Sequence, residues 1–134
     1  MNLVKILAAM QAKTREIYDQ TYAPKGEEER GAMSVQVLTD ESVNRWESAM
    51  ESFGKLHVPY FSLDCTVHEK IAYSRRTGKN SGAPKEDLVG QESHWEGAVV
   101  SADGKCICAF SGYDGADDVL IALAGIAEYE AQKG

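Results

Sequence analysis

The chain lacks the features of a membrane protein or a nucleic-acid-binding protein. No stretch approaches the ~20 consecutive apolar residues of a membrane-spanning helix. Lysine and arginine total 14 against 21 aspartates and glutamates, which gives a formal net charge of −7. The chain therefore lacks the excess of positive charge with which proteins bind the phosphate backbone of nucleic acids. The first residues also lack a secretory signal pattern, because Lys13, Arg15 and Glu16 continue a helical pattern. We therefore expect a soluble, cytoplasmic protein that binds neither membrane nor nucleic acid directly.

Cysteine is scarce, with only Cys65, Cys106 and Cys108, and the chain has no Cys-x-x-Cys pair. The spacing does not match structural zinc sites, whose ligands usually come in pairs two to four residues apart. Cys106 and Cys108 are two residues apart on a predicted strand, so both thiols should lie on one face and pack as small apolar groups. The alternative is a metal site that also uses the histidines His57, His68 and His94.

The first forty residues predict a helix and a short strand. Apolar residues recur at helical spacing between Leu3 and Ile17, which predicts an amphipathic helix over residues 2–20. Pro24 and the polar segment 25–31 follow this helix as a connector. Residues 34–39 alternate and are rich in β-branched side chains, which predicts a strand at the edge of a sheet.

Residues 40–74 predict a second helix and a hairpin. Asp40 is a suitable helix N-cap, and apolar residues at spacings of three and four predict a helix ending at Gly54 with those side chains in the core. They are Val43, Trp46, Met50 and Phe53. Residues 58–65 and 71–74 are expected to form paired strands. Residues 75–93 are polar and glycine-containing, which predicts a long functional or mobile loop.

The final forty residues give the strongest local signals. Asp103-Gly104 separates two apolar runs, at 98–100 and 105–110, and predicts a tight hairpin. A helix should follow Gly112, with acidic residues at its positively polarised N-terminus. Its apolar residues Val119, Leu123 and Ile126 are expected to share a core with Val99, Cys108 and Phe110.

These elements give the order α-β-α-β-β-loop-β-β-α. Helices at both ends and strands joined by hairpins predict an α+β fold with a mostly antiparallel sheet flanked by helices. The length of 134 residues fits one domain. We expect residues 1–39 to be an N-terminal helix-and-strand extension and residues 40–134 to be the core.

The 75–93 loop holds the basic cluster of this acidic chain. Its Thr77-Gly78-Lys79 segment is not a phosphate-binding Walker loop, because Tyr73 occupies the position of the required glycine and Asn80 follows the lysine. Arg75, Arg76 and Lys79 can still hold a carboxylate or a phosphate. The alternative interpretation is a solvated loop.

His94 and Trp95 lie at the mouth of the predicted C-terminal hairpin, and Ser111 and Gly112 follow its second strand. Together with the basic cluster they form our expected ligand site, and the first hypothesis is a non-catalytic module that binds a small ligand. The alternative is an acidic interaction or inhibitory module that acts on a basic partner protein through residues 114–130. No nucleophile, base and orienting group share a recognisable spacing, so an enzyme is the third hypothesis.

Several short motifs resemble the GlcG/HbpS-like family of haem-binding and haem-degrading domains. They are Gly97-Ala98-Val99-Val100, Asp103-Gly104, Ala109-Phe110-Ser111-Gly112, Asp117-Asp118 and the alanine- and glycine-rich run 121–127. The resemblance covers about residues 40–76 and 94–132. It implies a profilin-like fold, oligomer formation, and binding of haem or a small organic ligand. Haem would need an axial ligand, which only His57, His68 or His94 could supply well.

The N-terminal helix lies outside that resemblance and has a broad apolar stripe. Because a predicted edge strand follows it, and sheet edges must be paired or covered, we expect a homodimer. In that assembly the helix packs either across the interface or against its own sheet.

Overall fold

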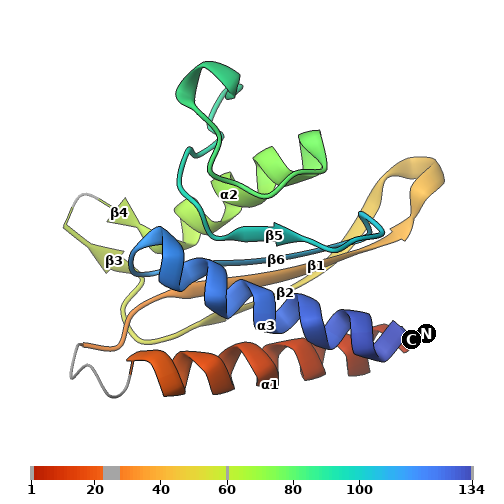
Figure 1. Cartoon of the computed structure of the whole chain (residues 1–134), viewed down its shortest axis with the longest axis horizontal. Helices are drawn as coiled ribbons and strands as arrows, with labels where there is room; N and C mark the ends of the chain where they lie inside the picture. The colour runs from red at the N-terminus through yellow and green to blue at the C-terminus, as the bar shows by residue number, and fades with distance from the viewer. Residues whose placement is uncertain (1, 23–27, 60, 134) are drawn as a thin grey trace.

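The four main strands pair into one antiparallel sheet in the order β2-β1-β6-β5 (Figure 1). This computed structural model describes residues 2–22, 28–59 and 61–133. The strands are β1 (Ala32–Asp40), β2 (Arg45–Ser52), β5 (Ala98–Val100) and β6 (Cys106–Ser111). β1 and β6 occupy the centre, and the residues of β6 are all buried.

Three helices cover the two faces of the sheet. α1 (Leu3–Tyr22) and α3 (Gly115–Lys133) run side by side over one face, and α2 (Leu63–Thr77) covers part of the other. Short elements complete the fold: β3 (His57–Val58), β4 (Phe61–Ser62) and the 3₁₀ turns η2 (Glu41–Val43) and η3 (Lys85–Asp87). The predicted α+β class with an antiparallel sheet is therefore confirmed.

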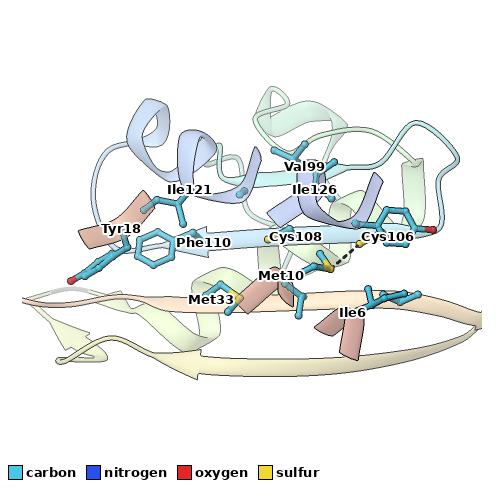
Figure 2. Close-up of a cluster of buried hydrophobic side chains, with 14 of the residues drawn as sticks. Ile6, Met10, Tyr18, Met33, Val99, Cys106, Cys108, Phe110, Ile121 and Ile126 are labelled. Atoms are coloured by element: carbon cyan, nitrogen blue, oxygen red, sulfur yellow. Dashed lines mark hydrogen bonds between the residues drawn. The ribbon is translucent and has the colours of Figure 1, made fainter. Parts of the chain in front are cut away.

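The larger core lies between the sheet and the α1–α3 pair (Figure 2). Cys106 and Cys108 both point into it, as their spacing predicts, and the Cys106 thiol lies 3.9 Å from the Met10 sulfur. Burial raises the pKa of the Cys108 thiol to about 12. α3 packs closely because Gly125 has no side chain, since a Cβ there would lie 2.5 Å from the Cys108 sulfur.

The N-terminal helix, the C-terminal hairpin and the closing helix all form where the sequence predicts them. α1 extends two residues beyond the expected end, and it packs against α3 and β1 of its own chain. Gly104 takes a φ of 73° in the β5–β6 turn, a left-handed conformation that glycine adopts without strain.

The helix predicted over residues 40–53 is wrong, because this segment forms η2 and β2. Trp46 and Met50 are spaced four apart, which fits a period of two as well as a helical period. β2 pairs with β1 along its length, so pairing in the β1–β2 hairpin makes this segment a strand. Of the expected core residues here only Phe53 is buried, whereas Val43 is 63% and Met50 42% exposed.

The strands predicted at 58–65 and 71–74 are also wrong, since α2 occupies most of this segment. Leu63, Val67 and Ile71 recur every four residues and pack together against the sheet, so a helical stripe was present in the sequence. Gly78 ends α2 with a φ of 72°, a left-handed helix C-cap.

Two further expectations are corrected. The strand at 34–39 is not an edge strand, because β1 pairs with β2 on one side and β6 on the other. Leu123 is 45% exposed, and Ile121 instead is completely buried in the core.

The difference in burial between Ile121 and Leu123 predicts that their alanine variants lose different amounts of stability. Ile121→Ala should lower the free energy of unfolding by about 2–5 kcal/mol, because it leaves a cavity in a packed core. Leu123→Ala should cost less than about 1 kcal/mol, since its side chain remains half in water. Urea unfolding followed by circular dichroism measures both, and equal losses would contradict this orientation of α3.

Candidate functional site

A cleft of about 280 Å³ opens where β6 ends and α3 begins. One wall is apolar and comes from the β3–β4 region and the start of α2. The rest of the lining includes residues of the 111–115 segment, which joins β6 to α3, and four charged side chains from different parts of the chain. Those four are Arg30, Lys70, Glu96 and Asp118.

A buried ion pair forms part of this cleft. Lys70 of α2 donates from its Nζ atom to a carboxylate oxygen of Asp118 at 3.1 Å and to the carbonyl of Phe110 at 2.9 Å. The two charged side chains are only 2% and 3% exposed. This pair joins the covering helix α2, the end of β6 and the first turn of α3.

The surrounding backbone contacts this pair and leaves room for it. The other carboxylate oxygen of Asp118 accepts the Tyr113 N–H at 3.1 Å, so the same carboxylate also holds the turn between β6 and α3. Gly97 lies directly against the pair, and a Cβ at that position would lie 2.6 Å from the Lys70 nitrogen. Its φ of 136° is also one that L side chains rarely adopt.

Burial shifts the pKa values of Asp118 and Lys70 in the directions that disfavour their charged forms. Desolvation raises the pKa of Asp118 to about 6, although the attraction of Lys70 acts in the other direction. Desolvation also lowers the pKa of Lys70, although the attraction of Asp118 and Glu96 opposes this shift. At neutral pH the carboxylate is ionised and the pair is formed. Its charges are mutually satisfied, so it supports the cleft rather than offering a free charge.

Arg30 provides the less satisfied cation. Its guanidinium group stacks over the Tyr113 ring at 4.8 Å from the centroid. Its Nε atom is shielded from solvent and has no hydrogen-bond acceptor among the described residues. Buried donors are nearly always paired, so this Nε–H is an exception among the described residues.

The structure brings together only part of the expected ligand site. Trp95, Ser111 and Gly112 line the cleft, and the His94 ring stacks beside Trp95 with centroids 4.6 Å apart.

The basic cluster lies elsewhere. The Arg75 guanidinium stacks over Trp46, 5.3 Å from its ring centroid. Arg76 forms two hydrogen bonds with the Glu92 carboxylate, at 2.7 and 2.9 Å. None of Arg75, Arg76 and Lys79 is among the described residues that line the cleft.

The acidic run at the start of α3 is largely engaged within the chain. Asp118 is buried with Lys70, and Asp114 accepts the N–H of Asp117 at 3.0 Å as a helix cap. Farther along, Glu130 accepts the N–H of Ala102 and pairs with Lys133. In the described part of the chain, no three histidine, cysteine or acidic side chains come together as metal ligands. Nor is any helix there long and apolar enough to cross a membrane.

Sequence reasoning missed Arg30, Lys70 and Glu96, and it interpreted Asp118 as a helix-capping residue. One signal was available. Lys70 follows Val67 by three residues and precedes Ile71, so a helical interpretation of 63–77 places a charged residue on the apolar face. Such a residue needs a buried partner.

Comparisons with known proteins show the fold alone. No protein-family model and no curated protein matches the chain. Among solved structures, the one titled "Crystal structure of Ybr137w protein" aligns with a TM-score of 0.71 at 14% sequence identity, covering 98% of this chain and 80% of that chain. The resemblance to GlcG/HbpS-like domains stays a prediction.

Removal of one partner of the buried pair should be strongly destabilising. Lys70→Met should lower the free energy of unfolding by about 3–5 kcal/mol, because it leaves the Asp118 carboxylate buried without its cation. The double variant Lys70→Met with Asp118→Asn should recover much of this loss, since the amide oxygen can still accept the Tyr113 N–H. Urea unfolding of the single and double variants measures the coupling. Additive losses would show that the two side chains do not interact.

The raised pKa of Asp118 also predicts a pH dependence. The unfolded carboxyl releases its proton near pH ~4, and the folded one near 6. Between these values the folded state binds more protons, so this group lowers the free energy of unfolding as the pH rises from about 4 to about 6. Comparison of unfolding curves for the native chain and Asp118→Asn across this range isolates the contribution. Parallel pH profiles for the two proteins would contradict it.

Proposed function

We propose that the chain binds a small anionic organic ligand in this cleft, without catalysing a reaction. The observation that carries the proposal is the Arg30 guanidinium group, which lines the cleft, stacks on Tyr113 and forms no ion pair with a described residue. A guanidinium group binds carboxylates and phosphates through charge-assisted hydrogen bonds. A ligand carboxylate in the cleft would pair with this positive charge.

The remainder of the cleft suits an organic molecule with an apolar part. Val58, Leu63 and Trp95 contribute apolar surface on the side of the β3–β4 region, α2 and the long loop. Ligand sites commonly combine such walls with a few placed polar groups. The Lys70–Asp118 pair lies at the base of this arrangement as a rigid support.

A small anion fits the cleft better than haem does. Haem would need an axial ligand, and only the three histidines of the chain could supply one well. None of the three is among the described residues lining the cleft, and His68 instead contacts the Asp64 carbonyl at 2.7 Å within α2. We therefore favour a small anionic organic ligand over haem.

The other expectations about partners stay predictions. An acidic module acting on a basic protein would use the face of α3, yet Asp118 and Glu130 there already have intramolecular partners. Homodimer formation and a cytoplasmic location also stay predictions, and nothing in the cleft depends on either.

A binding experiment tests the proposal. Calorimetry with 4-methylpentanoate, inorganic phosphate and haem should show binding of the first, a carboxylate with a short apolar chain. Arg30→Gln should weaken that binding on the order of tenfold or more, the effect of losing a charged hydrogen bond. Arg75→Gln is the matched control, because Arg75 stacks on Trp46 and does not line the cleft.

Two results would overturn the proposal. One is an absence of carboxylate and phosphate binding to the native protein. The other is equal binding by the native protein and Arg30→Gln, provided that circular dichroism shows both to be folded.

A further inference from the structure

We infer that the ligand carries an amine as well as a carboxylate, as in an amino acid with an apolar side chain. This inference rests on the proposed binding of an anion at Arg30 and extends it to the chemical class of the ligand. The observation behind it is a second charged group in the cleft, of opposite sign: the exposed carboxylate of Glu96, which attracts Lys70 but forms no hydrogen bond or ion pair with a described residue.

Glu96 lies beside the start of α3. A Cβ built on Gly115 would be 3.1 Å from the Glu96 Cβ and 3.4 Å from one of its carboxylate oxygens. The absence of a side chain at Gly115 therefore lets Glu96 approach the helix there. Among the described residues no hydrogen bond or ion pair holds its carboxylate, although it lines the cleft.

The four charged residues of the cleft divide into two pairs. Lys70 and Asp118 contact each other at 3.1 Å and are buried. Arg30 and Glu96 do not form such a contact, and they flank the 111–115 segment from different elements: Arg30 stacks on Tyr113, and Glu96 lies against Gly115. The two charges left open to a ligand are therefore one positive and one negative.

A ligand with one charge of each sign matches this arrangement. A carboxylate alone would satisfy Arg30 and also approach the negative Glu96, which is unfavourable. An ammonium group on the same molecule would turn that repulsion into an attraction and would satisfy the second open charge. The apolar wall of Val58, Leu63 and Trp95 would then contact the side chain of the ligand.

Three probes that share one branched apolar chain test the inference. L-Leucine has both charged groups, 4-methylpentanoate lacks the amine, and 3-methylbutylamine lacks the carboxylate. Calorimetry on the full chain should give the tightest binding for L-leucine. Its affinity should exceed that of 4-methylpentanoate on the order of fivefold, as expected for one partly exposed charge pair.

Substitution of Glu96 should weaken the binding of L-leucine without weakening the binding of 4-methylpentanoate. In Glu96→Gln the affinity for L-leucine should fall to about that of 4-methylpentanoate, and the affinity for 4-methylpentanoate should stay unchanged or rise. Glu86→Gln is the matched control, because Glu86 belongs to the exposed turn η3 and does not line the cleft. It should change neither affinity.

The outcomes separate this inference from the proposed function. If 4-methylpentanoate binds as tightly as L-leucine, or if Glu96→Gln acts no differently from Glu86→Gln, the amine is not recognised and the inference fails while anion binding stands. If neither carboxylate binds, or if 3-methylbutylamine binds as tightly as L-leucine, the role of Arg30 fails and both proposals fall.

Discussion

The buried contact between Lys70 and Asp118 constrains most of the other features of this molecule. Two charges that are each at most 3% exposed must be paired, because a single buried charge is strongly destabilising. Lys70 must therefore lie on the inner face of α2, and Asp118 must face inward from α3. Phe110 at the end of β6 supplies the remaining contact. One pair thus sets the relation between helices on opposite faces of the sheet.

The same constraint creates the cleft. The 111–115 segment turns from β6 into α3 while the Tyr113 N–H donates to Asp118, and Gly97 leaves room for the Lys70 amine. A pair that is satisfied internally gives the cleft a rigid base, which limits the loss of conformational entropy on binding. In the proposed function, ligand recognition falls to Arg30 and Glu96, the two charged lining residues outside the Lys70–Asp118 pair.

The fold could be predicted from the sequence where the local signals agreed. The prediction failed where those signals conflicted. Asp103-Gly104 between two apolar runs admits one structure, the β5–β6 hairpin. Trp46 and Met50, four residues apart, fit a helix or a strand, and pairing with β1 decides between them. The site was less predictable because its charged residues come from positions 30, 70, 96 and 118. Trp95, Ser111 and Gly112 were found because they lie beside a hairpin that could be placed.

The most direct test of the account observes the Arg30 side chain itself. In the ¹H–¹⁵N spectrum of the native protein, the Nε–H resonance of Arg30 should shift on addition of 4-methylpentanoate, as expected when a carboxylate binds beside the guanidinium group. It should do so along the same titration curve as the backbone amides of 111–115. The Arg75 resonance should not move. A titration that leaves the Arg30 resonance unchanged, or that shifts both arginines alike, would contradict a ligand site at this cleft.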